Sequence, residues 1–512
     1  MGFKEIVAKR SALKTSNTGV TTASQLTLKQ SLYPLALVTS LFFLWGFSYG
    51  LLDTLNKHFQ NTLGITRTRS SGLQAAYFGA YPLASIGYAG WMLRHWGYKP
   101  VFIFGLCTYA IGALMMWPSG VYRSFGGFCA ATFICGSGLG SLETAANPYL
   151  AVCGPPKYSE IRINFAQAFN GIGTVVAPAL ASYVFFKHTE DDVSALKNVQ
   201  WVYLAVACFA FFLAVAFFLS HIPEVTDADM EFQVQETHIA GTEKPFIKQY
   251  RLFHAAFAQF CYVGAQVAVA TWFINYATES TNVTASTASS LLAGAQAAFT
   301  VGRFSGTGLM RLVRPRLVFL FYLGGVIVAL ALATGVRGRA GIAMLYITLF
   351  FESVCFPTIV ALGIRGLGRH YKRGSGYIVG AVIGGGCVPA LQGKVADIHN
   401  STPLSMVVAL MFMVAAMSYA LCVNFVPRYR IPADALGDSS IGQKNNQVPQ
   451  SDIEAKQMDP STGKLTDEAT ATEVRSDEMR DDLKTTSCSD LARGFHSDRP
   501  GRRNEYCHTM RT

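Results

Sequence analysis

The sequence predicts an all-α membrane protein with twelve transmembrane helices in two six-helix halves. Three observations support this fold class. Of the 512 residues, 51% are hydrophobic and only 14% are charged, which is too apolar a composition for an ordinary soluble domain of this size. Stretches of about 20 apolar residues, the length that crosses about 30 Å of hydrocarbon as a helix, recur up to Pro427. One long hydrophilic break, residues 221–250, divides these stretches into six and six.

The predicted spans follow one another with short connections. They are residues 32–55, 70–91, 99–118, 124–149, 161–186, 200–220, 252–277, 286–308, 316–335, 340–364, 375–396 and 403–426. The first span is as long as the others, so we expect a retained helix after an N-terminal arm (residues 1–31) and not a cleaved signal peptide. Residues 32–220 then form an N-terminal domain, 221–250 a linker and 251–426 a C-terminal domain.

Charge predicts the topology. With the N-terminus in the cytoplasm, the inner loops carry more Lys and Arg than the outer ones, as the positive-inside rule requires. Residues 427–512 are polar and lack apolar periodicity, which predicts a disordered cytoplasmic tail, either regulatory or a solvated spacer. The net charge of +11 then faces anionic membrane lipid, so no nucleic-acid role is implied. We expect a monomer in the plasma membrane.

No cofactor or metal is expected. The eleven cysteines show neither C-x-x-C nor Cys/His metal spacing, and most lie inside predicted spans as small packing residues. The sequence also offers no nucleophile–base pair, which argues against a membrane enzyme.

Polar residues inside a span are functional candidates, because hydrocarbon cannot satisfy them. In the first span, Tyr49, Asp53 and Asn56 share one helical face. Asp53 is either a cavity residue or an interfacial one that pairs with Lys57. In the fourth span, Glu143 and Asn147 share a face, and we expect Pro148 to end or kink the helix.

Glu143 is either functional or a protonated structural carboxyl. In the fifth span, Gln167 and Asn170 lie one turn apart, and a single amide there is as consistent with interhelical bonding as with substrate contact. Two amides facing two carboxylates favour a binding cavity.

The second half offers a similar set of polar candidates. They are Gln259, Gln266, Asn275, Gln296 and Glu352, with Phe356 next to Glu352 in the tenth span. Glu352 either lines a cavity or pairs with a basic residue of another helix. The triple glycine 384–386 and Pro389 predict a deformable eleventh helix. The connections "GWMLRHWGYKP" and "GRFSGTGLMRLVRPR" echo each other, and each places Gly and Arg at a helix end before a basic turn.

A pocket lined by amides, carboxylates and aromatic rings suits a neutral polyol, because polar groups bind hydroxyls while flat rings stack on C–H faces. The candidate rings are those of Trp45, Tyr49, Tyr77, Tyr81, Tyr262, Trp272 and Phe356. A carboxyl that holds a proton when dry and releases it when wet can also couple transport to protons. Peptide or drug transporters use similar parts. Parallel six-helix halves around a central pathway are the major facilitator architecture.

Seven motifs add a resemblance. "FLWGFSYGLLDTLNKHFQ", "GLGSLETAANPYL", "RINFAQAFNGIG", "YVGAQVAVATWFINYA", "GRFSGTGLM", "FPTIVALGIRGLG" and "GSGYIVGAVIGGGCVPALQGKVAD" resemble the fucose:proton symporter family of the major facilitator superfamily, in fungal-like form. The resemblance implies that Asp53 and Glu143 act in substrate recognition and proton coupling. It also implies that Asn170, with Gln167 before it, lines a sugar pocket. The residues before Asp53, and Phe356 where the family has tyrosine, depart from the pattern and leave L-fucose itself open.

The sequence therefore predicts a proton-coupled symporter for a monosaccharide such as L-fucose, glucose or galactose, working by alternating access. The predicted proton-coupling residues are Glu143 and Asp53. The predicted substrate-binding residues are Asp53, Asn170, Gln167, Asn147, Tyr49, Gln266, Gln296, Glu352 and Phe356. Alternatives are a transporter-like nutrient sensor that signals through its tail, a carrier of another small solute such as N-acetylglucosamine, a facilitator without protons, and an exporter.

Overall fold

The protein is seen in a computed structural model that describes residues 28–63, 65–153, 156–181, 195–220, 222–225 and 245–435. Within these ranges the regular elements are all helices, which confirms the predicted fold class. Residues 1–27 of the predicted N-terminal arm, residues 221 and 226–244 of the predicted linker and the tail beyond residue 435 lie outside the described residues. The side chains of residues 53–63, Asp53 and Asn56 among them, also lie outside them.

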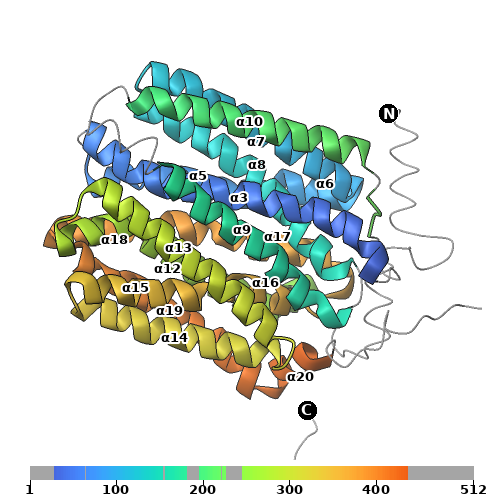
Figure 1. Ribbon diagram of the computed structural model, residues 1–512. Helices are drawn as coiled ribbons and strands as arrows, with labels where there is room; N and C mark the ends of the chain where they lie inside the picture. The colour runs from blue at the N-terminus through green and yellow to red at the C-terminus, as the bar shows by residue number, and fades with distance from the viewer. Residues whose placement is uncertain are drawn as a thin grey trace, which may run out of the picture. The chain divides into compact units, whose positions relative to one another are not determined.

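The N-terminal half runs from α3 to α10. Its elements are α3 (Leu28–Leu63), α4 (Arg67–Ser70), α5 (Gly72–Pro82), the π-helix η1 (Leu83–Tyr88), α6 (Ala89–Trp96), α7 (Tyr98–Val121), α8 (Phe125–Val152), η2 (Pro156–Tyr158), α9 (Ser159–Ala181) and α10 (Ala195–Leu219). The helix α7 packs between α8 and α10, while α3 packs along α9 (Figure 1). All six predicted spans of this half fall on these helices.

The C-terminal half continues from η4 to α20. Its elements are η4 (Phe246–Lys248), α12 (Tyr250–Thr281), α13 (Ala285–Leu309), α14 (Pro315–Gly335), α15 (Gly338–Glu352), α16 (Cys355–Ile364), η5 (Gly368–His370), α17 (Tyr371–Gly380), η6 (Ala381–Ile383), α18 (Gly384–His399), α19 (Thr402–Phe425) and α20 (Pro427–Ala435). Residues 427–435, expected at the start of the tail, thus form the short helix α20.

Two of the C-terminal spans are interrupted. The eleventh is split into α17, η6 and α18, with the triple glycine at the start of α18, as the deformable-helix prediction anticipated. The tenth is also interrupted, at Ser353–Val354 between α15 and α16, where an unbroken helix was expected. The break at Ser353–Val354 frees backbone carbonyls, so it must lie where protein groups or a wet cavity can satisfy them.

Nine spans within the described ranges are long and apolar enough to cross a membrane. The other three predicted spans fall on α5–η1–α6, α9 and α13. These helices are less apolar for a structural reason. They carry polar side chains such as Gln74, Gln167 and Arg303, all buried, toward other helices instead of lipid.

The two halves meet along two seams. One seam joins α9 to α13, and the other joins α5 and η1 to α17, η6 and α18. Both seams need residues without side chains. A Cβ on Gly171 would lie 2.7 Å from Thr300 Oγ1, and one on Gly376 would lie 2.7 Å from the carbonyl oxygen of Ser85. Glycine at these places therefore allows helices of opposite halves to approach closely.

Of the two expected effects of Pro148, the helix end is not found, because α8 continues for another turn to Val152. A hydrogen bond from the other half reaches this residue. The Tyr371 hydroxyl of α17 donates to the Pro148 carbonyl oxygen at 2.9 Å. Because proline lacks an N–H, the helical hydrogen bond that it removes is the one to the carbonyl oxygen of Thr144, so the Tyr371 bond ties α17 to α8 and does not replace it.

Candidate functional site

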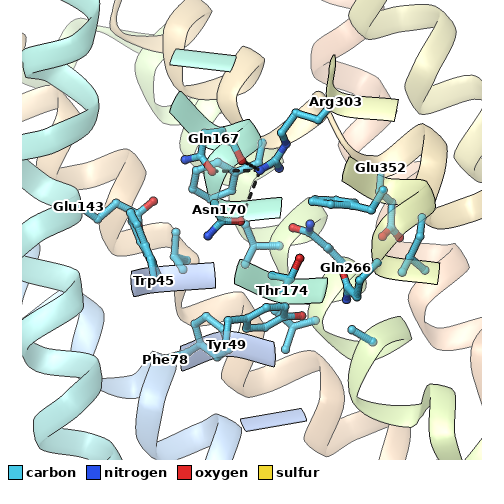
Figure 2. Close-up of a pocket in the computed structure, with 18 of the residues that line it drawn as sticks. Trp45, Tyr49, Phe78, Glu143, Gln167, Asn170, Thr174, Gln266, Arg303 and Glu352 are labelled. Atoms are coloured by element: carbon cyan, nitrogen blue, oxygen red, sulfur yellow. Dashed lines mark hydrogen bonds between the residues drawn. The ribbon is translucent and has the colours of Figure 1, made fainter. Parts of the chain in front are cut away.

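A cavity lies between the two halves, near the middle of the interface helices. Its walls come from α3, α5, α8 and α9 on one side and from α12, α13, α15, α16 and η6 on the other (Figure 2). The lining residues are Trp45, Tyr49, Phe78, Tyr81, Glu143, Gln167, Asn170, Thr174, Val263, Gln266, Val267, Ala270, Gln296, Phe299, Arg303, Leu349, Glu352, Phe356 and Val382.

Most of the predicted site residues meet in this one cavity. Eight of them line it: Tyr49, Glu143, Gln167, Asn170, Gln266, Gln296, Glu352 and Phe356. Asn147 is not among the lining residues but contacts Glu143. Asp53 belongs to α3, and its side chain lies outside the described residues. The individual roles of these residues remain predictions.

Glu143 forms the acidic wall of the N-terminal half. Its side chain is 1% exposed, and Oε1 accepts a hydrogen bond from Asn147 Nδ2 at 3.2 Å. Its other oxygen, Oε2, has no hydrogen-bond partner among the described residues. Beside it, Trp45 Nε1 donates to the Tyr81 hydroxyl at 3.0 Å, which fixes both rings against the cavity. A buried carboxyl with a free oxygen must be protonated or must receive a ligand or water hydrogen.

Glu352 forms a second acidic position, across the cavity in the C-terminal half (Figure 2). It is the last residue of α15 and is 1% exposed. Its Oε1 has no hydrogen-bond partner within the described ranges, and no ion pair of Glu352 occurs there. Of the two interpretations left open by the sequence, the structure therefore favours the cavity residue over the buried ion pair.

The break in the tenth span is held by side chains from neighbouring helices. The Tyr262 hydroxyl of α12 donates to the carbonyl oxygen of Glu352 at 2.5 Å. Arg303 Nε of α13 donates to the carbonyl oxygen of Ser353 at 2.6 Å. The carbonyls freed between α15 and α16 are thus satisfied, and the break brings Glu352 and Phe356 to the cavity from two helix ends.

Arg303 is the charged cavity residue that the sequence interpretation missed. The motif "GRFSGTGLM" was assigned to a helix end and its basic turn, but Arg303 lies six residues before the end of α13, is 2% exposed and lines the cavity. Its guanidinium also lies 4.4 Å from the ring centroid of Phe299, one turn earlier. An arginine inside a predicted span was itself the signal, because such charges are rarely placed in a membrane without a function.

Some predicted aromatic and amide residues do not line the cavity but pack or hold the helices around it. Tyr262 holds the helix break, and Trp272 Nε1 donates to the Pro389 carbonyl oxygen at 3.1 Å, which ties α12 to α18. Tyr77 and Gln259 are buried but are not among the lining residues. The aromatic rings that line the cavity are those of Trp45, Tyr49, Phe78, Tyr81, Phe299 and Phe356.

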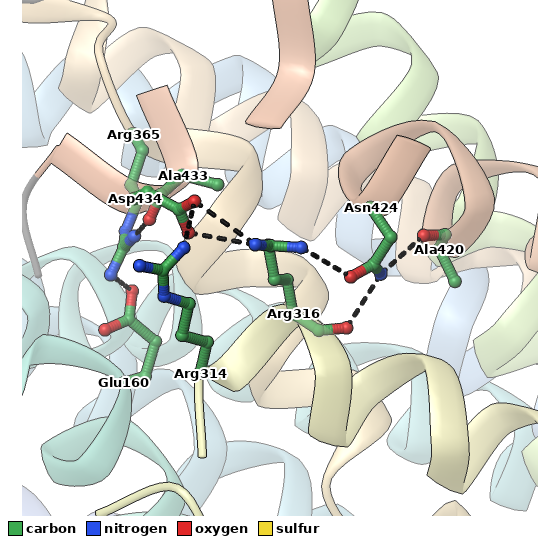
Figure 3. Close-up of polar contacts among 8 residues, drawn as sticks. All are labelled: Glu160, Arg314, Arg316, Arg365, Ala420, Asn424, Ala433 and Asp434. Carbon is green, nitrogen blue, oxygen red and sulfur yellow. Dashed lines mark hydrogen bonds and ion pairs between the residues drawn. The ribbon is translucent and has the colours of Figure 1, made fainter. Parts of the chain in front are cut away.

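A second polar cluster lies away from the cavity, near α20 (Figure 3). We name it the charged cluster, and it consists of Glu160, Arg314, Arg316, Arg365, Asn424, Ala433 and Asp434. Arg365 forms an ion pair with Glu160 of the other half and also donates to the Ala433 carbonyl oxygen. The carboxylate of Asp434 forms ion pairs with Arg314 Nη1 and with Arg316 Nε, both at 2.9 Å. Arg316 Nη1 donates to Asn424 Oδ1 at 3.0 Å.

No group of three or more His, Cys, Asp or Glu side chains suited to a metal ion occurs among the described residues. The chemistry of the cavity is therefore built from carboxyl, amide, guanidinium and aromatic groups. Such a set binds and releases a polar ligand and can exchange protons with it.

Comparison with known proteins decides the family. A family model of the Major Facilitator Superfamily matches residues 38–390. The chain belongs to the Major Facilitator Superfamily. Within the superfamily, the chain is 34% identical over 404 residues to the L-fucose-proton symporter of Escherichia coli (strain K12), covering 74% of this chain and 91% of that protein. It is 32% identical over 370 residues to a glucose/galactose transporter of Brucella abortus biovar 1 (strain 9-941), covering 71% of this chain and 88% of that protein.

Solved structures agree. The outward conformation of the superfamily transporter FucP has a TM-score of 0.63 and 30% identity, covering 76% of this chain and 98% of that chain. The partially occluded inward-open xylose transporter XylE of E. coli has a TM-score of 0.56 at 11% identity, which shows the shared fold. The predicted resemblance to the fucose:proton symporter family is confirmed. The chain is a multi-pass membrane protein of a transporter family, not of an enzyme family.

Proposed function

We propose that this chain is a proton-coupled symporter that moves a monosaccharide, such as L-fucose, glucose or galactose, by alternating access. The observation that carries the proposal is the cavity between the halves. It combines two buried carboxyls that each have an oxygen without a partner among the described residues with amides and aromatic rings. Relatives named as L-fucose-proton and glucose/galactose transporters support the choice of sugar and proton as cargo.

The lining suits a neutral sugar in shape and chemistry. Sugar hydroxyls both donate and accept hydrogen bonds, so they can satisfy the free carboxyl oxygens and the amide groups together. The rings of Trp45, Tyr49 and Phe356 offer apolar faces for the C–H side of a pyranose. In this proposal Gln167, Asn170, Gln266 and Gln296 contact the sugar, and Asn147 holds Glu143 in place.

Glu143 is proposed as the proton carrier. When the cavity is dry, its unpartnered oxygen favours the protonated carboxyl, and when water enters, the charged form becomes favourable. Access to alternate sides of the membrane thereby links proton binding to conformation. Asp53 is proposed to contact the sugar and to assist coupling, as the family resemblance implies.

Contacts between the halves on either side of the cavity support alternating access. After the first span, Thr68 donates to Asp397 Oδ2 through its backbone nitrogen at 3.1 Å and its hydroxyl at 2.6 Å. Between the tenth and eleventh spans, Arg365 pairs with Glu160. By the order of spans these two contacts lie at opposite membrane faces, so each has to open while the other holds. We place the Glu160–Arg365 end and both termini in the cytoplasm, and we propose a monomer in the plasma membrane.

Uptake of labelled hexoses into a transporter-deficient host tests the proposal. We expect the wild-type chain to accumulate at least one hexose, with accumulation abolished by a protonophore. Glu143→Gln should lose accumulation but retain exchange of internal for external sugar, because a glutamine binds hydroxyls but carries no proton. The matched control is Glu279→Gln, since Glu279 accepts from Thr402 outside the cavity. Unchanged accumulation in Glu143→Gln would contradict the assigned role.

A further inference from the structure

Arg303 reaches across the interface between the halves and binds amide oxygens of α9. Its Nη1 donates to the Gln167 carbonyl oxygen at 2.6 Å, to Gln167 Oε1 at 3.2 Å and to Asn170 Oδ1 at 3.4 Å. Its Nε donates to the carbonyl oxygen of Ser353 at the break between α15 and α16. The buried charge is therefore met by oxygens on both sides of the interface, and in the described chain no carboxylate pairs with it.

These contacts determine which end of each amide is available to a ligand. The side-chain oxygens of Gln167 and Asn170 face Arg303, because a guanidinium has only donors and an amide NH2 would be repelled by it. Figure 2 shows the two amide nitrogens turned away from Arg303, toward the side of the cavity where Glu143 lies. The N-terminal wall thus presents N–H donors from α9 and, in the same cavity, the free acceptor oxygen of Glu143.

We infer that Arg303 is a specificity-determining positioning residue, which fixes the amides of Gln167 and Asn170 with their NH2 groups toward the substrate. This inference rests on the proposed function. A sugar hydroxyl is the chemical group that matches the resulting pattern, because its oxygen accepts from an amide N–H while its hydrogen is donated to Glu143. A keto or ether oxygen satisfies only the amide, and an amine satisfies only the carboxylate.

The first test replaces an amide by its isosteric carboxylate. Gln167→Glu keeps an oxygen for Arg303 but exchanges the NH2 donor for a second acceptor. We expect the dissociation constant of the hexose bound by the wild-type chain to rise roughly tenfold or more. The thermal midpoint in detergent should stay at or above that of wild type, because Arg303 gains a charged partner. Binding as tight as wild type overturns the inference, since the oxygen end would then be the end that faces the sugar.

The second test is a double-mutant cycle between the arginine and the amide. We expect Arg303→Met to weaken sugar binding. In a Gln167→Met background most of that loss should disappear, because Arg303 then has one amide fewer to orient. The matched control is Arg311→Met, an exposed arginine two residues after the end of α13, which should bind sugar like the wild type. Additive losses overturn the inference.

The outcomes separate the inference from the proposed function. A wild-type chain that binds no hexose contradicts both. Wild-type binding together with additive losses, or with tight binding by Gln167→Glu, overturns the inference alone. If Arg303→Met does not fold, sugar binding by the isosteric Gln167→Glu variant still tests the inference.

Discussion

The central cavity and the charged cluster use the same residue types in opposite ways. In the charged cluster, the carboxylates of Glu160 and Asp434 meet arginines (Figure 3). In the cavity, Glu143 and Glu352 are as buried as Glu160, yet each keeps an oxygen without a partner among the described residues. A satisfied carboxylate stabilises the conformation that satisfies it, whereas an unsatisfied one is available to a ligand or a proton. The comparison predicts that substitutions in the two regions change stability and transport in different proportions.

The largest loss of stability is expected at the ion pair between the halves. Arg365→Met leaves the Glu160 carboxylate buried without its cation, and breaking such a pair typically costs about 3–5 kcal/mol. We expect a clearly lower midpoint of thermal unfolding in detergent than for wild type. Arg339→Met, at an exposed arginine, is the control and should leave the midpoint unchanged. A wild-type midpoint in Arg365→Met would show that the charged cluster does not hold the halves together.

A smaller loss is expected where the charged cluster is open to solvent. Arg314 is 60% exposed and Asp434 21% exposed, so their attraction is screened. Arg314→Met removes this exposed contact and leaves the Arg316–Asp434 pair in place. It should reduce stability by about 1 kcal/mol or less, and the difference from wild type should shrink further at high salt. Thermal unfolding at low and high ionic strength measures both effects. A loss of stability as large as that of Arg365→Met, at either salt concentration, would contradict our expectation that the buried Glu160–Arg365 pair contributes most of the stability of the charged cluster.

The smallest change in stability is expected in the cavity. Glu143→Gln keeps the shape and an acceptor for Asn147 while removing an incompletely satisfied carboxyl, so we expect a midpoint equal to or slightly above that of wild type. Binding sites often carry such suboptimal groups because function requires them. Loss of proton-driven accumulation without loss of stability is therefore the signature of a cavity residue. Strong destabilisation by Glu143→Gln would make Glu143 structural instead.

The sequence predicted the helices well because bilayer thickness sets the length of each apolar stretch. It also predicted eight lining residues, since buried polar groups such as Glu143 and Asn170 have few other reasons to be there. The break at Ser353–Val354 was not predicted. Its stabilising groups, Tyr262 and Arg303, come from other helices.

Two further features depend on partners that no local pattern contains. The Pro148 carbonyl oxygen of α8 accepts a hydrogen bond from Tyr371, more than 200 residues later in the chain. Arg303 was assigned to a helix end before a basic turn and not to the cavity, because its amide partners lie on α9, in the other half. Tertiary contacts of this kind decide between alternatives that local sequence leaves open.

The central claim is that the cavity binds sugar and proton together through Glu143. Its most direct test is the proton movement that a sugar gradient drives in proteoliposomes containing the purified chain, followed with a pH-sensitive dye and no applied proton gradient. We predict that an inward gradient of a transported hexose acidifies the lumen with the wild-type chain and not with Glu143→Gln, while both exchange labelled sugar. Equal acidification by both chains would contradict the claim.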